Sequence, residues 1–141
     1  MADSNRSAGI RCVIVTPETT VLDTTARGVV LPLEDGQRGI GRGHAPFIGR
    51  LGAGEVRIAT GDGREAGQRV FVDRGFVEVG HDTVTVVTQQ ALLADKLDLA
   101  KARANLAGIT AKPATGDEAI AAKLAAQQSA REVVRIAGRA R

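Results

Sequence analysis

Aromatic side chains are nearly absent from the sequence, which has three phenylalanines, no tryptophan and no tyrosine among 141 residues. A core must therefore be built from valine, isoleucine, leucine and alanine. Proteins that hold single-stranded nucleic acid stack its bases on aromatic side chains. This scarcity weighs against a free-standing basic module that binds nucleic acid, although such a module, or a small protein adaptor, remains an alternative interpretation of the chain.

Cysteine is also scarce, and long apolar runs and a large net charge are missing. Cys12 is the only cysteine, so no internal disulfide can form, which fits a reducing compartment. No apolar run reaches the ~18 residues of a membrane-spanning helix. We expect residues 1–9 to form a polar, disordered tail rather than a signal peptide. The formal net charge of +3 is modest, and it is compatible with an acidic protein partner.

Residues suited to catalysis or metal binding are few. His44 and His81 are the only histidines, and with Cys12 they lack the spacing of a metal site. The serines form no recognisable catalytic triad with them; they are Ser4, Ser7 and Ser129. We therefore predict no catalytic site, no metal and no cofactor, and we expect a role in binding or coupling.

Residues 10–90 are predicted to form an antiparallel β-sandwich of about ten short strands. Segments rich in β-branched residues recur between turns that contain glycine. These segments are 10–16, 19–25, 26–33, 47–51, 55–60, 68–73, 76–80 and 83–89. Residues 80–82 are typical of a hairpin turn. Beside this turn, alternation points Phe76 or Val77 inward. Glu78 and Thr85 are outward candidates.

Residues 91–141 are predicted to form an αα-hairpin, because they are rich in good helix formers. The first helix has apolar residues at helical spacing, namely Leu99, Ala102, Leu106 and Ile109. Gly108 is its predicted end. Residues 109–116 contain a proline and a glycine, which predicts a loop. Thr115 and Glu118 have the spacing of a capping box that opens the second helix.

The second helix carries only a weak apolar stripe. The stripe consists of Ile120, Leu124 and Val134, and it is interrupted by Gln127, Gln128 and Arg131. Alanine, which is frequent on both helices, buries little area per residue. We therefore expect the hairpin to be marginal by itself and able to leave its docking site.

Three arginines of the second helix, Arg131, Arg135 and Arg139, recur every fourth residue and so share one face. Like charges at this spacing cost ~0.2–0.5 kcal/mol per pair in an isolated helix. Two interpretations stay open. The arginines form a solvated basic face, or they meet an acidic surface on a partner.

The glycine segment, GQRGIGRGHAP at residues 36–46, is the most unusual motif in the chain. It lacks the Lys-Ser/Thr pair of a phosphate-binding P-loop. No helix follows that could hold a phosphate at its N-terminus. We therefore interpret the segment as two tight turns around a short strand, with the glycines supplying positive φ.

Several motifs together resemble those of one family. The glycine segment is similar to the pattern G-x-x-G-I-x-x-G-H-A-P of the epsilon subunit of bacterial and chloroplast F-type ATP synthases. Four further stretches continue the resemblance: VIVTPETTVLD (13–23), LGAGEVRI (51–58), GFVEVGHDTVTVV (75–87) and LDLAKA (97–102). The resemblance covers residues 10–107, with a looser fit over 117–136.

The resemblance implies a non-catalytic subunit of the central stalk of a proton-translocating ATP synthase. This subunit rotates with the gamma subunit and couples the c-ring to the catalytic head. The glycine segment would form turns at the end of the sandwich that meets gamma and the polar loops of the c-ring. That places Gln37, Arg38, Arg42 and His44 near the contact. The implied location is peripheral, on the cytoplasmic face of the inner or thylakoid-type membrane, without insertion.

The resemblance also implies regulation by the C-terminal helices. In the family they fold against the sandwich, or extend toward an acidic segment of the beta subunits and inhibit ATP hydrolysis. Arg131, Arg135 and Arg139 would make this acidic contact. Some bacterial members bind ATP through a pattern [IL]-D-x-x-R-A. Here Lys101 follows Asp98 where the family has arginine, and an ammonium cannot replace a bidentate guanidinium. We therefore expect at most a weak ATP site at these two residues.

Overall fold

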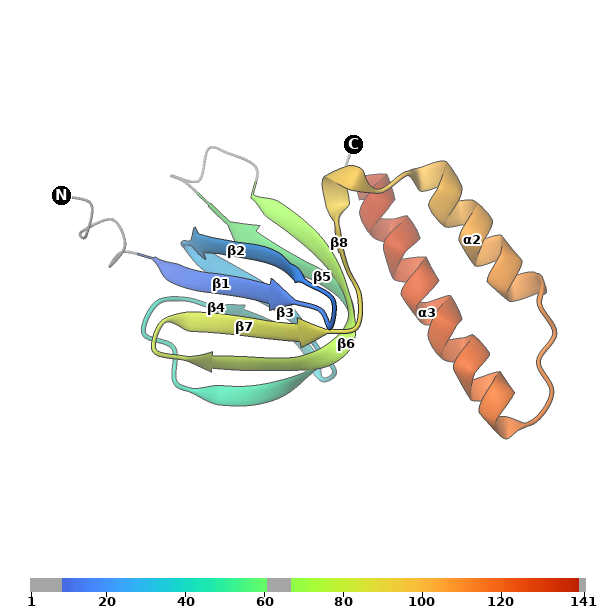
Figure 1. Cartoon of the computed structure of the whole chain (residues 1–141), viewed down its shortest axis with the longest axis horizontal. Coiled ribbons are helices and arrows are strands. Elements are labelled where there is room, and N and C mark those ends of the chain that lie inside the picture. Colours follow the sequence, from blue (N-terminus) through green and yellow to red (C-terminus); the bar gives the residue numbers. More distant parts are fainter. Residues whose placement is uncertain (1–8, 61–66, 140–141) are drawn as a thin grey trace.

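The computed structural model describes residues 9–60 and 67–139. In this part of the chain the strands come first and the helices last (Figure 1). The elements are β1 (Ile10–Val15), β2 (Thr20–Ala26), β3 (Gly28–Leu33), β4 (Gly36–Ile40), β5 (Phe47–Ala59), β6 (Gln68–Gly80), β7 (Thr83–Thr88), β8 (Ala91–Leu93), the 3-10 turn η1 (Ala94–Lys96), α2 (Leu99–Ala111) and α3 (Asp117–Arg139). The expected disordered tail at residues 1–9 lies outside the described residues except for Gly9.

The predicted β-sandwich followed by an αα-hairpin is confirmed. The strands pair in the order β2-β1-β7-β6-β5-β3-β4, and β8 adds to β6. β5 and β6 have 13 residues each and pair along most of their length, so both run through the two layers. One layer holds β2, β1 and β7 with the later half of β6. The other holds β8, β3 and β4 with the earlier half of β6.

The sandwich differs from the prediction in two respects. β1 and β7 run parallel, so the sandwich is not wholly antiparallel. The segments expected as four short strands, at 47–51 with 55–60 and at 68–73 with 76–80, are the two long strands β5 and β6. The described residues therefore hold eight strands rather than about ten. The glycines between the predicted segments bend these strands without ending them, because the pairing between β5 and β6 resumes beyond each bend.

The bend of β6 requires glycine. Gly75 has a φ of +123°, and a Cβ at this position would collide with the carbonyl oxygen of Val87. Arg74, just before it, has a φ of +58°, which few residues other than glycine adopt. The glycine that opens the GFVEV stretch is therefore required by the corner of the sandwich.

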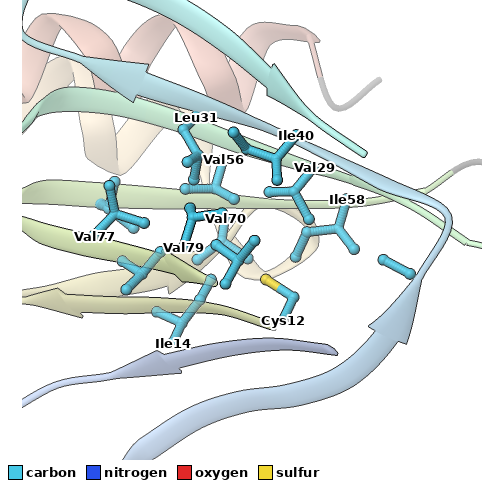
Figure 2. Packing of buried hydrophobic residues seen from close by; sticks show 14 of the residues in the cluster. Cys12, Ile14, Val29, Leu31, Ile40, Val56, Ile58, Val70, Val77 and Val79 are labelled. Carbon is cyan, nitrogen blue, oxygen red and sulfur yellow. The ribbon is translucent and has the colours of Figure 1, made fainter. Parts of the chain in front are cut away.

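The core between the two layers is aliphatic, as the composition requires. Figure 2 shows side chains from β1, β3, β4, β5 and β6 meeting there, among them Cys12, Ile14, Val29, Leu31, Ile40, Val56, Ile58, Val70, Val77 and Val79, all buried. Val77 is the inward residue of the two candidates, since Phe76 is 54% exposed. Glu78 is exposed as expected, and Thr85 is half-buried.

The predicted hairpin turn between β6 and β7 is confirmed. His81 and Asp82 both have positive φ, at 51° and 55°. Two consecutive residues in this conformation form the turn whose twist matches that of the flanking strands. β6 and β7 are accordingly adjacent and antiparallel.

The first helix follows its predicted face but not its predicted end. Ala102 is buried and the other predicted face residues are half-buried. α2 continues through Gly108 to Ala111. It stops there because Lys112 precedes a proline and takes an extended conformation, with φ −76° and ψ 121°.

The capping box predicted for the second helix is wrong. α3 begins at Asp117, so Thr115 lies one residue too early to cap it. The residue next to the helix is Gly116, whose φ is +92°. The N–H of Ile120 donates to the carbonyl of Gly116 at 2.9 Å. Gly116, rather than Thr115, therefore marks the start of the helix.

The predicted apolar stripe of α3 is also misplaced. Ile120 and Leu124 are 45% and 60% exposed. The buried residues are instead Gln127, Ala130, Ile136 and Ala137. Gln127 donates from Nε2 to the hydroxyl of Thr110 on α2 at 3.3 Å. The reason is the placement of the hairpin: α3 lies between α2 and the sandwich and meets the sheet mainly toward its C-terminal end (Figure 1).

Candidate interaction surfaces

α3 docks on the sandwich through a small apolar cluster. Phe71, Ala94 and Ile136 are buried in it, with Leu97 and Val133 packed around them. Phe71 lies on β6 on the face turned away from the sandwich core, since its neighbours Val70 and Val72 point into that core. Burying a side chain of this size contributes ~1.5–3 kcal/mol. Few large residues take part, so the apolar contribution to docking is limited.

The Arg74 latch (Asp73, Arg74, Ala125 and Ser129) joins the bend of β6 to the middle of α3. Arg74 donates from Nη2 to the Ala125 carbonyl at 3.0 Å and to the Ser129 hydroxyl at 3.3 Å. Ser129 in turn donates to Oδ1 of Asp73 at 2.8 Å. A guanidinium nitrogen of Arg74 also lies 3.5 Å from that carboxylate oxygen. The latch therefore holds the helix to the sheet by polar contacts that water can replace.

The Glu55 cluster (Glu55, Arg57, Arg69 and Arg139) holds the C-terminal end of α3. Glu55 is 4% exposed and accepts a hydrogen bond from Nη1 of Arg69 at 2.7 Å. Guanidinium nitrogens of Arg57 and Arg139 lie 3.9 Å from its other oxygen. Arg69 also donates to the Ile136 carbonyl at 3.4 Å, where the helix dipole favours a cation. A buried carboxylate needs such partners, so the cluster ties β5, β6 and α3 together.

The three arginines predicted to share one face of α3 are not equivalent. Arg131 is exposed. Arg135 donates from Nε and Nη2 to one oxygen of Glu132, at 2.9 and 2.6 Å. Arg139 lies beside Glu55. The repulsion expected within the stripe is therefore compensated at two of its positions while the hairpin is docked. The contact of the stripe with an acidic partner stays a prediction.

The glycine segment forms the predicted short strand between two turns, but only two of its four glycines supply positive φ. β4 covers Gly36–Ile40, and in the turn that follows the His44 N–H donates to the Gly41 carbonyl at 3.2 Å. Gly36 and Gly43 have positive φ, at 129° and 78°. The N–H of Gly43 donates to Oδ1 of Asp82 at 2.6 Å. The segment and the β6–β7 turn therefore lie at the same end of the sandwich.

The four predicted contact residues follow one another along β4 and the turn after it, with Gln37 and Arg38 in the strand and Arg42 and His44 in the turn. Gln37, Arg38 and Arg42 are exposed, and His44 is half-buried. The Arg38 guanidinium carbon lies 4.9 Å from the centre of the Phe47 ring, and the His44 ring is tilted against the same ring at 5.4 Å. Two of the four predicted contact residues, Arg38 and His44, therefore contact the same aromatic ring. Their contact with a partner stays a prediction.

An apolar surface that the sequence analysis missed lies on the outside of β5, β6 and β7. We call it the outer face; it consists of Ile48, Phe76 and Val87, which are 75%, 54% and 48% exposed. Phe76 pairs with Val87 on one side and with Arg50 on the other. The Arg50 guanidinium lies 5.9 Å from the Phe76 ring. The sequence signal for this surface is a large apolar residue at a position where the alternation within the strand predicts an outward side chain.

The two residues assigned to a weak ATP site lie at the start of α2. Asp98 is the N-cap, and its Oδ1 accepts the Lys101 N–H at 3.1 Å. Such a cap stabilises a helix by ~1 kcal/mol. Lys101 is exposed in the first turn. Asp98 therefore has a structural role of its own, and a nucleotide role for the pair stays a prediction.

Two sites in the sandwich have shifted pKa values. Burial, with a smaller contribution from Asp23, raises the pKa of the Cys12 thiol from 9.0 to about 12. At the surface of β1 and β2, Arg11 donates two hydrogen bonds to Asp23 at 2.7 and 3.0 Å. This pairing lowers the pKa of Asp23 and raises the pKa of Arg11. Cys12 lies in the core, away from the predicted contact residues. The Arg11–Asp23 pair lines a surface hollow together with Arg42.

The polar contacts of the hairpin were also missed from the sequence. Glu55 and Arg69 stand 14 residues apart in the chain but pair across β5 and β6. Each is only one of several charged residues in its strand, so no local pattern marks the pair. No described helix is long and apolar enough to cross a bilayer. Within residues 9–60 and 67–139, no three His, Cys, Asp or Glu side chains are gathered as a metal site would need.

Comparison with known families gives a match over the sandwich. Residues 9–94 match the family model described as "ATP synthase, Delta/Epsilon chain, beta-sandwich domain". The ATP synthase epsilon chain of Rhodopirellula baltica is 46% identical over 126 residues, which are 89% of this chain and 96% of that one. The sodium-ion-specific ATP synthase epsilon chain of Propionigenium modestum is 33% identical over 132 residues, 92% of this chain and 94% of that one.

A solved structure supports the fold. A chain of the Euglena gracilis mitochondrial ATP synthase, solved as OSCP/F1/c-ring, superposes with a TM-score of 0.77 at 17% identity, covering 89% of this chain and 79% of that one. The sequence matches favour a subunit of an ATP synthase over the alternative of a free-standing binding module. The chain belongs to the ATP synthase delta/epsilon family and is of the epsilon type, whose members are non-catalytic subunits of the central stalk.

Proposed function

We propose that the sandwich binds the gamma subunit through the outer face and that the glycine segment at residues 36–46 contacts gamma and the c-ring. The observation that carries this is the outer face, because a folded monomer seldom exposes adjacent large apolar residues on neighbouring strands unless they bind a partner. Gln37, Arg38, Arg42 and His44 supply the polar part of the contact. In this position the chain transmits torque from the ring at the cytoplasmic face of the membrane.

Substitution in the outer face tests the gamma contact. Phe76→Ser removes an aromatic side chain that the core does not use, so the sandwich should keep its melting temperature. We expect binding to purified gamma to weaken at least about tenfold, since a buried aromatic side chain contributes ~1.5–3 kcal/mol. Ile120→Ser, at an exposed site on α3, is the matched control. Equal affinity of Phe76→Ser and the parent chain would show that gamma binds elsewhere.

A shortened chain tests whether the sandwich suffices. The boundary expected at residue 90 falls before β8, which pairs with β6, and the family match ends at residue 94. A chain that stops after Lys96 keeps both. We propose that it binds gamma as tightly as the full chain does. Complete loss of binding would place the contact in the helices.

We propose that the hairpin leaves the sandwich and inhibits ATP hydrolysis by placing Arg131, Arg135 and Arg139 against acidic residues of the beta subunits. The contacts that hold it down support this idea. They are one small apolar cluster and two polar groups, the Arg74 latch and the Glu55 cluster. When the hairpin leaves the sandwich, Arg139 loses its ion pair with Glu55 and forms one with a carboxylate of the beta subunits, so its charge stays paired.

The arginine stripe is tested in the assembled enzyme. Replacing Arg131, Arg135 and Arg139 with alanine should relieve inhibition of hydrolysis at low salt, where exposed charge attraction is strongest. Arg103→Ala on α2 is the control, since that residue is also exposed but lies off the stripe. A triple variant that inhibits as well as the parent would leave the stripe as a solvated face.

A further inference from the structure

β4 is the edge strand of its layer. It pairs with β3, and no strand of residues 9–60 and 67–139 lies on its other side. Its five residues pair with β3 without a register shift, and all of them except Ile40 are exposed. An edge of this kind presents backbone donors and acceptors to any extended chain that approaches it.

The backbone groups that point outward belong to Gln37 and Gly39. The residue opposite Gln37 is Pro32, which has no N–H to donate. Bonded and non-bonded pairs alternate along an antiparallel ladder. Arg38 therefore bonds to β3, whereas Gln37 and Gly39 direct their N–H and C=O groups to the open edge. The two-residue turn at Glu34 and Asp35 implies the same alternation, because such a turn closes on a bonded pair.

One of the two residues that face the open edge of β4 is a glycine, and neither the backbone conformation nor the packing of the chain requires glycine there. Gly39 lacks a positive φ, and a Cβ built on it would have nothing within 4 Å. Gly41 shares both properties. Glycine inside a strand weakens it, and it often marks a place where another backbone comes close. Neither the backbone conformation nor the packing of the chain requires glycine at positions 39 and 41, and the missing side chains leave space for a second backbone beside β4.

The edge of the opposite layer is better protected than β4. β2 pairs with β1 through an irregular register between Ile14 and Val15. It also carries Asp23, paired with Arg11 at 2.7 Å. Bulges and charges are the usual protection of edge strands against pairing. β4 has no bulge, lysine or proline, and its one charged residue, Arg38, has its guanidinium over the Phe47 ring.

Charge distinguishes the two ends of the open edge. Glu34 and Asp35 stand just before β4, and Arg42 stands just after it. A partner strand that pairs along β4 is therefore complemented by a basic residue at one end and an acidic residue at the other. A helical turn could offer the charges but not the row of free backbone groups, so the surface fits an extended segment.

We infer that an extended segment of gamma adds to β4 as a further strand, pairs its backbone with Gln37 and Gly39, and places an acidic side chain beside Arg42. The inference rests on the proposed function for the identity of the partner. The mode of contact, strand addition at this edge, follows from the geometry of β4.

Amide hydrogen exchange with residue resolution tests the inference on the unaltered chain, free and in its complex with gamma. In the free chain the amides of Arg38 and Ile40 should exchange slowly, and those of Gln37 and Gly39 fast. In the complex Gln37 and Gly39 should slow by about tenfold or more. A complex in which these two amides exchange as in the free chain would overturn the inference alone. Failure of the chain to bind gamma would overturn the proposed function as well.

A pair of substitutions separates backbone pairing from side-chain contact. Gln37→Pro removes an outward N–H that β3 does not use, and edge strands tolerate proline at such positions. Gln37→Ala removes the side chain and keeps the N–H. Gln37 is one of the residues proposed to contact gamma, so the alanine variant measures what its side chain contributes. We expect the proline variant to bind gamma about tenfold or more weakly than the alanine variant. The inference is overturned by equal affinities of the two variants, provided that the proline variant keeps its melting temperature. If that variant unfolds, the exchange experiment decides.

Discussion

Ile136→Ala should loosen the docking of the hairpin without weakening the sandwich. Ile136 is fully buried and belongs to the docking cluster of Phe71 and Ala94 rather than to the core between the sheets. The substitution deletes three carbon groups, worth ~0.8 kcal/mol each, so docking loses ~2.4 kcal/mol before any cavity is counted. Each 1.4 kcal/mol is tenfold in an equilibrium constant, so the undocked fraction should rise roughly 50-fold.

Hydrogen exchange of the α3 amides measures this opening directly, because local opening and global unfolding have separate free energies. Residues 130–137 should lose protection by the predicted factor, while amides of β6 and β7 should keep theirs. Ile120→Ala makes the same chemical change at a site that is 45% exposed, and it should leave docking unchanged. If Ile136→Ala leaves the protection of α3 unaltered, the docking free energy does not come from this cluster. If β6 and β7 lose protection equally, the hairpin and sandwich unfold as one unit.

Three other predictions follow from single residues. The pKa of the Cys12 thiol is raised to about 12, so above pH 9 the unfolded chain ionises first and the free energy of unfolding should fall by about 1.4 kcal/mol per pH unit. Cys12→Ala should remove that slope in pH-dependent denaturant unfolding, and a slope that persists would assign it to another group. Gly75→Ala should destabilise the sandwich by more than ~2 kcal/mol, because its Cβ collides with β7, whereas Gly39→Ala should cost less than ~0.5 kcal/mol. Urea unfolding compares the two, and equal costs would contradict the geometry at the β6 bend. Calorimetry should find weak or no ATP binding to the chain and stronger binding to Lys101→Arg, whose guanidinium can bind phosphate in a bidentate manner. Micromolar affinity of the unaltered chain would contradict this.

Local sequence patterns determined the class of each region. Alternation with a period of two predicts strands, and spacing of three and four predicts helices, so the sandwich and the hairpin could be read in order along the chain. The turn at residues 80–82 and the conformation of the glycine segment follow from residues that tolerate positive φ. These features depend on neighbours within a few positions, which is the range that sequence spacing reports.

Tertiary structure alone decided which segments meet. β1 lies parallel to β7 although about 70 residues separate them in the sequence. Gln127 is buried where α3 packs against α2, and its amide finds a partner there in Thr110. Ile120 is exposed because the sheet does not reach that far along α3. Glu55 is tolerated in a buried position because Arg69 arrives from the next strand. Burial depends on what packs against a residue from elsewhere in the chain, and no local period encodes that.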